Sequence, residues 1–209
     1  CSNNTIIRNN ITQCRRGIEI EGRTFYEEHA SNNTIIENNI EYLGEAIWSI
    51  GHGIGLSYAS NNQIVRNKII PSEGWDWRMG GHEDSIGVSL YCSFNNSMIE
   101  NSIEQNGEGI KLVDSSLNNI TDNNLTDNFY GMLLQGSQVN SLIGNNVTHS
   151  PVIFRGNKTG VVGYGIFISH PYYSNLLRNN SIAGYMYNFG VDSGYYFQDI
   201  DTSNTVDGK

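Results

Sequence analysis

NSMIENSIEQNGEGIKLV at residues 96–113 and NNITDNNLTDNFYGMLLQ at residues 118–135 are two copies of one sequence pattern. In each copy an apolar residue follows an Asn by two positions, a second Asn follows by five, and a Gly opens a final apolar alternation. The first Asn of this unit recurs along the whole chain, at Asn4, Asn33, Asn62, Asn96, Asn118, Asn140, Asn175 and Asn204. A regular sequence period, lengthened in some repeats by insertions, predicts a solenoid of stacked repeats.

The apolar residues of each repeat alternate with other residues over short runs, which is typical of β-strands rather than helices. Three short strands cannot bury their own apolar face, so each repeat must stack on the next at about 4.8 Å. Stacking makes the strands parallel and aligns the Asn residues in columns, where their amides can hydrogen-bond as in cross-β ladders. We therefore predict an all-β fold, a single-stranded right-handed parallel β-helix of about seven coils, with the handedness that parallel crossovers generally prefer.

Two details of each coil follow from this prediction. The apolar residues after the repeated Asn residues should form one buried column of Ile6, Ile35, Ile64, Met98, Ile120, Leu142, Leu177 and Val206. The Gly before the third strand, as at Gly53 or Gly109, is expected at a tight bend with a positive φ. A leucine-rich repeat is the nearest alternative, but the Leu-x-x-Leu-x-Leu spacing is absent and amphipathic helical stretches are scarce.

The composition excludes several classes of function. The chain has 209 residues, with 21 acidic and 12 basic side chains and a net charge of −9, which disfavours nucleic acid and anionic membrane surfaces as partners. No apolar run reaches the length of about 18 residues that a transmembrane segment needs. The three cysteines lack the spacing of a metal site, and the His and Met residues are scattered, so we expect neither a metal nor another cofactor.

The sequence begins inside the repeat. Cys1 takes the register of the residues before Asn96, so we expect one β-helix domain over 1–209, a fragment of a longer chain on which further coils or neighbouring subunits could stack. A lipid-modified mature N-terminus at Cys1 is the alternative. The glycosylation sequon, which is consistent with an exported glycoprotein, begins at Asn3, Asn10, Asn32, Asn95, Asn119, Asn124, Asn146, Asn157 and Asn179.

The unit Ser-x-x-Asn-x-Ile-x-x-Asn-x-Ile, ending in Gly-Ile-x-Leu, resembles the repeats of the right-handed parallel β-helix families. These are the NosD-type periplasmic copper-binding family and the carbohydrate-binding and sugar-hydrolase β-helix family. Residues 199–209, DIDTSNTVDGK, are similar to a segment of archaeal surface proteins in that group. The resemblance implies a β-helix over essentially the whole chain. It implies no particular activity, because these families include polysaccharide lyases, hydrolases, epimerases and noncatalytic surface proteins.

Insertions beyond the 22-residue minimal repeat gather at one turn. Coils two, three, six and seven expand between their second and third strands, at residues 41–52, 70–86, 148–164 and 183–193, whereas coils four and five do not. The first coil expands after its third strand instead. Because insertions in repeat proteins map to loops and often to the binding face, we predict two loop walls about 14 Å apart with a low floor between them. That width suits a chain of sugars better than a folded protein.

The first predicted wall carries all three Trp residues of the chain. Aromatic rings stack on the C–H faces of sugars, and charged side chains hold their hydroxyls or acidic groups. We therefore predict carbohydrate binding by Trp48, His52, Trp75, Trp77 and Arg78, and by Tyr130 and Tyr164 on the floor. The alternative is that the Trp residues only bury their own loops against the solenoid.

Two columns of side chains should run down the floor. The first is Arg16, His52, Ile86, Glu108, Tyr130, Tyr164 and Ser193, and the second is Glu19, Gly55, Ser89, Lys111, Leu133, Phe167 and Tyr196. The candidate catalytic residues are His82, Asp84, Glu108 and Lys111, because the last two project beside the wall that carries the first two. Paired carboxylates would suit glycoside hydrolysis and a Lys or His base would suit lyase chemistry, unless these residues are only solvated surface charges.

Two functions remain open on the sequence. The leading hypothesis is an exported, extracellular or cell-surface protein that binds or processes polysaccharide between the loop walls, as a hydrolase or lyase if it is an enzyme. The alternative is a noncatalytic structural segment of a cell-surface layer or fibre.

Overall fold

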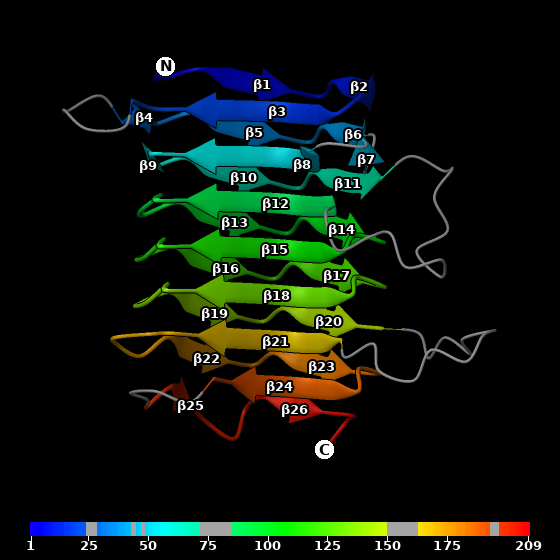
Figure 1. Ribbon diagram of the computed structural model, residues 1–209, viewed down its shortest axis with the longest axis vertical. Helices are drawn as coiled ribbons and strands as arrows, with labels where there is room; N and C mark the ends of the chain where they lie inside the picture. The colour runs from blue at the N-terminus through cyan, green and yellow to red at the C-terminus, as the bar shows by residue number, and fades with distance from the viewer. Residues whose placement is uncertain (24–28, 43–44, 47–48, 72–84, 150–162, 193–196) are drawn as a thin grey trace.

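The computed structural model describes residues 1–209 except 24–28, 43–44, 47–48, 72–84, 150–162 and 193–196. Its described residues form strands and turns, without a helix. Three sheets, here called A, B and C, run the length of the stack in Figure 1. Two short additions are β4 (Ala30–Ser31), which pairs with β9 (Ala59–Ser60), and β7 (Glu45–Ala46), which pairs antiparallel with β8 (Ser49–Ser57).

Each sheet takes one strand from every coil. Sheet A contains β1 (Thr5–Ile7), β5 (Thr34–Ile36), β10 (Gln63–Val65), β13 (Ser97–Ile99), β16 (Asn119–Thr121), β19 (Ser141–Ile143), β22 (Leu176–Arg178) and β25 (Asp199–Ile200). Sheet B contains β2 (Asn10–Cys14), β6 (Asn39–Tyr42), β11 (Lys68–Pro71), β14 (Ser102–Glu104), β17 (Asn124–Thr126), β20 (Asn146–Thr148), β23 (Ser181–Ala183) and β26 (Thr205–Val206). Sheet C contains β3 (Arg16–Glu21), β8, β12 (Ser85–Tyr91), β15 (Glu108–Val113), β18 (Tyr130–Gln135), β21 (Tyr164–Ser169) and β24 (Tyr187–Val191).

The strands of each sheet follow chain order and pair in parallel. One turn of the chain therefore passes through A, B and C and returns to A beside its starting strand. This arrangement is a parallel β-helix, and it confirms the predicted all-β solenoid. The described strands complete seven coils, and β25 and β26 begin an eighth.

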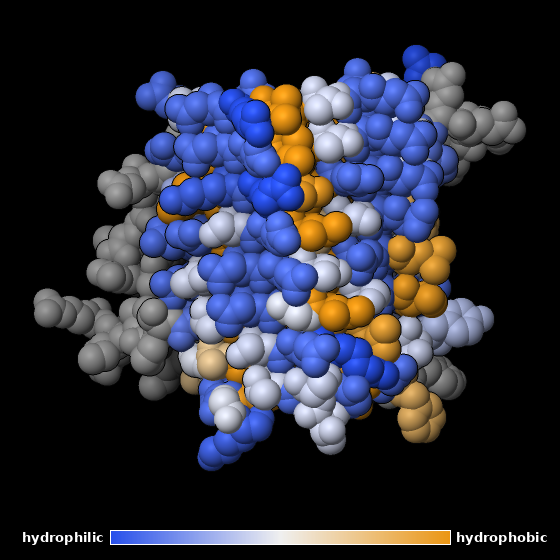
Figure 2. Space-filling model, turned by 180° about the vertical axis from the view of Figure 1, so that it is seen from behind, coloured by the Kyte–Doolittle hydropathy of each residue, from blue (hydrophilic) through white to orange (hydrophobic). Residues whose placement is uncertain are grey.

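Strand alternation sends every second side chain out of the solenoid. Seen from behind, the surface is largely hydrophilic, with an apolar stripe that descends from the N-terminal coils (Figure 2). The registers of sheet A place four outward apolar residues in one column there, Ile7, Ile36, Val65 and Ile99. The stripe is therefore one part of this face where the polar-out pattern is broken, and further apolar patches lie lower on the same face.

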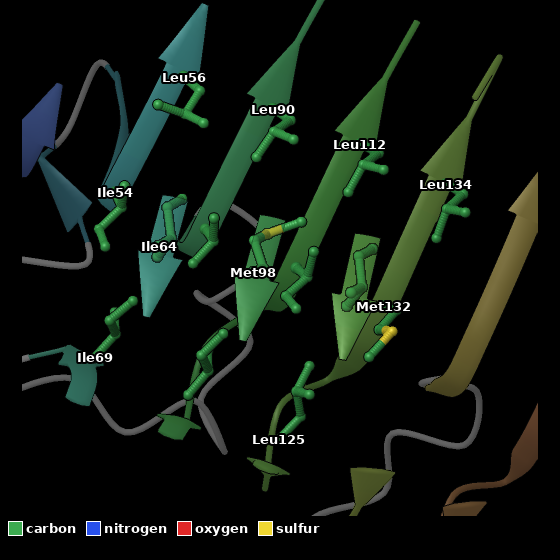
Figure 3. Packing of buried hydrophobic residues seen from close by; sticks show 14 of the residues in the cluster. Ile54, Leu56, Ile64, Ile69, Leu90, Met98, Leu112, Leu125, Met132 and Leu134 are labelled. Atoms are coloured by element: carbon green, nitrogen blue, oxygen red, sulfur yellow. The ribbon is translucent and has the colours of Figure 1, made fainter. Parts of the chain in front are cut away.

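The inward side chains of the three sheets form one continuous core (Figure 3). Ile64 of sheet A and Ile69 of sheet B lie in the same coil, and both are fully buried. The predicted column after the repeated Asn residues is buried from Ile35 to Leu177, as expected. Its last member was predicted wrongly, because Ile200 continues the column.

The correction at the C-terminus is a shift of register. Ile200 pairs with Leu177 in sheet A, whereas Val206 pairs with Ile182 in sheet B. The reason is that Asn204 belongs to the second Asn column of the coil and not to the first, where a Gln stands instead. A sequence search for Asn alone therefore misplaced the eighth repeat by one strand.

Buried asparagines hold the coils at their spacing. The backbone N–H and side-chain amide of Asn96 donate to Oδ1 of Asn118 at 2.9 and 3.1 Å, and Asn118 donates in the same way to Asn140. The Asn118 amide also donates to the carbonyl of Ser93 at 3.1 Å. This ladder runs from Asn4 to Asn175, and Gln198 accepts its last bonds. The predicted Asn columns are confirmed.

A second ladder runs parallel to the first at the corner between sheets A and B. It extends from Asn9 to Asn204, and Asn180 donates its backbone N–H to Oδ1 of Asn204 at 3.0 Å. The residue before each ladder Asn commonly has a positive φ, as at Asn95 (55°) and Glu100 (54°). This left-handed residue turns the chain, and the Asn after it then bonds both neighbouring coils.

The repeat glycines are required because there is no room for a side chain, and not because they have a positive φ. The predicted tight bend with a positive φ is therefore wrong. Gly53 and Gly109 lie inside β8 and β15, and neither is among the positive-φ residues. A Cβ at Gly109 would lie 2.6 Å from the carbonyl oxygen of Gly131 and 2.9 Å from the Leu125 side chain. Glycine is needed because two coils and the core of sheet B approach each other too closely for a side chain.

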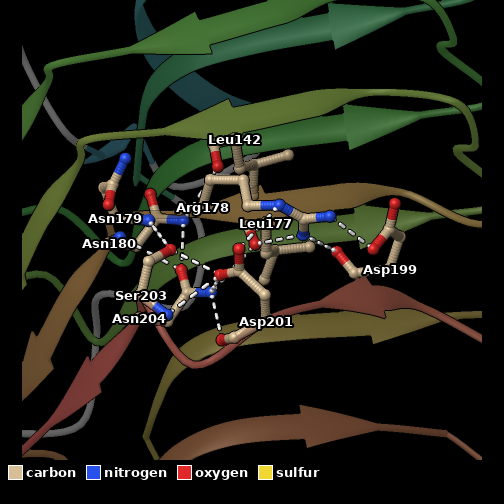
Figure 4. A network of polar contacts seen from close by, with 9 residues as sticks. All are labelled: Leu142, Leu177, Arg178, Asn179, Asn180, Asp199, Asp201, Ser203 and Asn204. Atoms are coloured by element: carbon tan, nitrogen blue, oxygen red, sulfur yellow. Dashed lines mark hydrogen bonds and ion pairs between the residues drawn. The ribbon is translucent and has the colours of Figure 1, made fainter.

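Charged groups fasten the eighth coil to the seventh (Figure 4). The Arg178 guanidinium donates to the carbonyl of Asp199 at 2.7 Å and pairs with the carboxylates of Asp199 and Asp201 at 2.6 and 3.0 Å. Hydrogen bonds from the Ser203 hydroxyl and N–H, with the nearby Arg178 charge, hold the pKa of Asp201 below its usual value. The loop before β26 is therefore ordered by one arginine and one serine.

The ladder predicts the effect of truncating one buried carboxamide. Asn118→Ala should lower the free energy of unfolding by about 1–3 kcal/mol, because the Asn96 N–H and amide lose their acceptor in a buried place. Asn119→Ala is the matched control, since Asn119 is the next residue and its side chain is exposed. Equal melting temperatures for the two variants in thermal unfolding would contradict the ladder.

Removing the arginine should loosen the last coil alone. In Arg178→Met, the N–H of Thr205, which donates to Asn180 O at 2.8 Å, should exchange with solvent much faster than in the parent chain. The N–H of Asn119, bonded to Asn96 O at 2.8 Å in the middle of the stack, provides the internal reference. Hydrogen exchange followed by NMR measures both, and an unchanged rate at Thr205 would show that Arg178 is dispensable.

Candidate functional site

The outer face of sheet C carries the described part of the predicted site. Pairing registers confirm the two predicted columns from the first coil to the sixth, so Glu108 lies between Ile86 and Tyr130 along the stack. The first column is Arg16, His52, Ile86, Glu108, Tyr130, Tyr164 and Tyr187, and the second is Glu19, Gly55, Ser89, Lys111, Leu133, Phe167 and Gly190. Their last members were predicted as Ser193 and Tyr196, which is wrong.

That error arises in the seventh coil. The expansion at 183–193 is not where it was predicted, because β23 ends at Ala183 and β24 begins at Tyr187. The extra residues of this coil follow β24 in the sequence. Tyr185, only 7% exposed, fills the short B-to-C turn and packs against the core. The insertions between sheets B and C are therefore three, in coils two, three and six.

A charged cluster occupies the N-terminal end of this face. Arg16 donates two hydrogen bonds to the Glu19 carboxylate, at 2.8 and 3.0 Å, and Nε2 of His52 lies 3.6 Å from the same carboxylate. The His52 ring rests on Gly55, where a Cβ would come within 2.5 Å of Nε2. Gly55 thus lets the imidazole lie flat along the sheet, with its side chain only 12% exposed.

Burial sets the protonation of His52. Desolvation lowers the pKa of the imidazole below its usual value, and Arg16 acts in the same direction, while the Glu19 carboxylate opposes both. A neutral imidazole can accept a proton, so His52 is a possible base as well as the predicted carbohydrate contact. Arg16 and Glu19 were not predicted as the partners of His52, although both belong to the predicted floor columns.

An ion pair lies two coils further along the same face. Nζ of Lys111 donates to one oxygen of the Glu108 carboxylate at 2.9 Å and lies 2.8 Å from the other. Their side chains are 21% and 9% exposed, so this pair is much less solvated than an ordinary surface pair. The structure brings together these two predicted catalytic residues. The spacing explains it, because Glu108-Gly-Ile-Lys111 repeats the Arg16-Gly-Ile-Glu19 arrangement with the charges reversed.

Aromatic rings cover the C-terminal half of the face. Tyr130 and Tyr164 stack with ring centroids 5.9 Å apart and planes 9° from parallel, and Tyr164 stacks on Tyr187 at 5.1 Å. Phe167 contacts the Tyr164 ring at 4.6 Å. The predicted contacts Tyr130 and Tyr164 are therefore members of a longer stack that the sequence did not complete. Pairing by coil could have found Tyr187 if the seventh coil had been placed correctly.

The site is anchored at the edge where the insertions leave. Beside the insertion of coil three, the buried Tyr42 of coil two donates its hydroxyl to Oδ1 of Asn106, two coils away, at 2.5 Å. Asn106 and Asn128 form a short third ladder, with 2.8 Å between the Asn106 amide and Oδ1 of Asn128. Burial raises the pKa of Tyr42, so its phenol stays protonated and keeps this bond. Tyr42 thus covers the core at the edge between sheets B and C.

Six predicted site residues lie outside the described residues. They are Trp48, Trp75, Trp77, Arg78, His82 and Asp84. In the described part, Glu19 and Glu108 are three coils apart, about 14 Å, which exceeds the carboxylate spacing of either kind of glycoside hydrolase. Glu19 is therefore too distant to be a hydrolytic partner for Glu108, and the predicted partner Asp84 lies outside the described residues.

Metal and membrane features complete the survey of the described residues. No three His, Cys, Asp or Glu side chains gather there as a metal site would need. No helix in this part has the length and apolarity of a membrane span. All three cysteines are free thiols.

Comparison with known proteins places the chain in a family. The model of the right-handed beta helix region matches residues 1–182, so the chain belongs to this family and the predicted right-handed fold is confirmed. Among solved structures, the periplasmic alginate epimerase AlgG has 18% identity and a TM-score of 0.56, and the match covers 97% of this chain and 42% of that one. No curated protein sequence matches the chain.

A second similar structure is the A-module of mannuronan C-5 epimerase AlgE4 from Azotobacter vinelandii. It has 16% identity and a TM-score of 0.60, and the match covers 98% of this chain and 54% of that one. The chain therefore spans about half, or less, of the length of these neighbours. At this identity the likeness shows the fold and leaves the activity open.

The pKa of His52 gives a pH prediction. Because the folded-state pKa lies below the unfolded value of about 6.5, the neutral ring contributes stability above that pH, and this stability is lost as pH falls toward the folded pKa. Gly55→Ala should displace the ring into solvent, raise its pKa and weaken this pH dependence. NMR titration of the ring protons measures both chains, and identical His52 titration curves would contradict the burial of the ring.

Proposed function

We propose that the chain is part of an exported β-helix protein that binds and processes polysaccharide along the outer face of sheet C. The observation that carries the proposal is the continuity of this face: a tyrosine stack runs directly into a largely buried Glu108–Lys111 pair. The outward edges and hydroxyls of the stacked rings can contact successive sugars, and a charged pair of low exposure can hold or deprotonate the sugar beside it.

The geometry of the coil supports a polymeric ligand. Side chains of one column repeat at about 4.8 Å, so an extended chain along the solenoid axis meets equivalent groups at every coil. Tyr187, Tyr164 and Tyr130 would bind three successive units, and Glu108 would face the next. Ile86 and Ser89 then leave a low, uncharged stretch before His52 and its partners.

Each group has a definite role in this proposal. The tyrosines bind, Lys111 holds a hydroxyl or acidic group, and Glu108 or the neutral His52 accepts a proton. Trp48, Trp75, Trp77 and Arg78 are proposed as further binding groups, and His82 and Asp84 as further catalytic ones, on the insertions at the edge of the face. Two structural neighbours, a periplasmic alginate epimerase and a mannuronan epimerase module, support a polysaccharide ligand, and the first supports an exported location for this chain.

A structural segment of a surface layer is the second candidate, and one observation favours it. Leu117 and Val139 occupy left-handed turn positions, with φ of 60° and 55°, and their side chains are 57% and 48% exposed. Asn stands at this position in several other coils and tolerates that conformation better. A bulky apolar residue is strained in the left-handed conformation, and its exposure to water is unfavourable. Contact with a neighbouring subunit would offset both costs.

Binding separates the two candidates. A glycan array with neutral and acidic oligosaccharides, alginate among them, should give a ligand whose affinity falls about tenfold or more in Tyr187→Ala, because one aromatic contact at the end of the stack is lost. Tyr172→Ala is the control, since Tyr172 is 77% exposed at a corner outside the face. A chain that binds no glycan, or binds equally well in both variants, would support the structural segment.

Chemistry requires a separate measurement on any glycan that binds. Glu108→Gln and Lys111→Met should abolish product formation, detected by mass spectrometry and NMR of the glycan, while ligand binding survives in at least one of them. Thr126→Ala, on the outer face of sheet B, is the matched control. Full activity in both site variants would remove these residues from the mechanism and leave the binding face standing.

A further inference from the structure

Alternating charges line the corner between sheets A and B. The residue before the second-ladder Asn is Arg8, Glu37, Arg66 and Glu100 in the first four coils. Neighbours pair along the stack, with Arg8 to Glu37 at 2.7 Å, Arg66 to Glu37 at 2.9 Å and Arg66 to Glu100 at 3.6 Å. The order of charges from coil one to coil four is therefore plus, minus, plus, minus.

The two ends of this charge ladder are less well neutralised than its middle. Glu37 receives hydrogen bonds from both Arg8 and Arg66, which lower the pKa of its carboxyl. Glu100 has only the longer contact to Arg66 among the described ion pairs, and its side chain is 53% exposed. The Arg8 side chain is 73% exposed. The ladder thus presents a basic end at Arg8 and an acidic end at Glu100.

An apolar column lies directly beside the charge ladder. It consists of the residue before each charged one, Ile7, Ile36, Val65 and Ile99, which pair in register on the outside of sheet A. This is the stripe visible in Figure 2. Ile7 is 45% exposed, Ile36 and Ile99 are partly exposed, and Val65, at 9%, is nearly buried. A continuous apolar stripe with a charged rim is the usual make-up of a small protein interface.

We propose that a second copy of the chain docks on this surface, antiparallel, about a two-fold axis between coils two and three. The rotation exchanges coil one with coil four and coil two with coil three. Arg8 then faces Glu100 of the partner subunit, and Glu37 faces Arg66 of the partner subunit. All four contacts are attractive because an alternating series of even length is complementary to its own reversal, as an isologous interface requires.

The charges also select this register over its neighbours. An axis moved to pass through coil three would place Arg66 against Arg66 of the partner subunit and Glu37 against Glu100 of the partner subunit. These three contacts are repulsive and outnumber the two attractive contacts between Arg8 and Asp122 of the partner subunit, so the next register is disfavoured. In the proposed register the apolar stripes of the two copies also face each other. Ile7 meets Ile99 of the partner subunit, and Ile36 meets Val65 of the partner subunit.

The dimer leaves the proposed binding face free. Sheet C lies on another side of each solenoid from the stripe, so both copies keep their tyrosine stacks accessible. Exposed ion pairs are individually weak and screened by salt, and the stripe is narrow, so the association is weak and salt-dependent. Two linked faces would still hold a long polysaccharide more tightly than one.

Sedimentation equilibrium of the whole chain under reducing conditions tests the dimer. At low ionic strength the parent chain should dimerise with rising concentration, and the dissociation constant should rise about tenfold or more in high salt. Glu100→Arg should abolish the dimer, because it places Arg against Arg8 of the partner subunit. Asp114→Arg, which changes an exposed acid at the corner between sheets C and A, is the control and should dimerise like the parent.

A charge exchange makes the test specific. Adding Arg8→Glu to Glu100→Arg should restore the dimer. Residues 8 and 100 are three coils apart in one chain, about 14 Å, so this rescue can act only between chains. A parent chain that stays monomeric at every concentration overturns the proposal. So does a double variant that keeps the parent's circular dichroism and melting temperature and yet stays monomeric.

If the charge variants unfold, Ile36→Ser in the stripe serves instead. It should weaken the dimer about tenfold while the chain stays folded, because this side chain points outward and is only partly covered in one copy. Thr34→Ser, two residues earlier on the same face of β5, is its control. Unchanged association in folded Ile36→Ser would also overturn the proposal.

Discussion

The buried carboxamide of asparagine is the interaction on which the rest of this structure depends. Each ladder Asn accepts two bonds from the coil before it and donates both to the coil after it and to a carbonyl of the coil before it, so it links three coils at once. Such a group is costly to bury unless every bond is made, and here the next copy of itself makes them. The ladders thereby fix the coil spacing and register that align all the outward columns.

The second constraint is the close approach at the repeat glycines. Because a Cβ at Gly109 or Gly131 would meet the carbonyl of the next coil, only glycine fits at these positions near the start of each sheet C strand. The insertions begin at the edge between sheets B and C. Buried tyrosines cover the core at this edge, and Tyr42 donates a hydrogen bond to Asn106 across the third coil. Variation is therefore tolerated at the B-to-C edge while the ladders and the core stay regular. The proposed binding face lies beside that edge.

Much of the fold could be predicted from the sequence because the repeat pattern is nearly explicit. Alternation and the Asn columns gave the strands, the parallel stacking and the core from Ile35 to Leu177. The eighth coil could not be placed because Gln198 stands where the first ladder has an Asn in the other coils. The seventh could not be placed because its B-to-C turn is short and is filled by Tyr185. The glycine prediction failed for another reason: a positive φ and a close approach both select Gly, and only coordinates distinguish them.

The site was predictable where it depends on the coil and unpredictable where it depends on side-chain contacts. Columns placed Glu108 beside Lys111 and Tyr130 beside Tyr164, because register alone decides these neighbours. The contact between His52 and Glu19 depends on the His52 imidazole lying over Gly55, which no sequence pattern predicts. Predictions on the insertions, such as Trp75, stay predictions, since those residues lie outside the described part of the chain.

The most direct measurement is an NMR titration of the chain with the tightest glycan from the array, following the aromatic ring signals. If polysaccharide lies along the outer face of sheet C, the rings of Tyr130, Tyr164 and Tyr187 should shift together with one saturation curve. The rings of Tyr58 and Tyr172, at the corner between sheets C and A, should stay unchanged. Saturable shifts at the corner tyrosines with none along the stack would contradict the account.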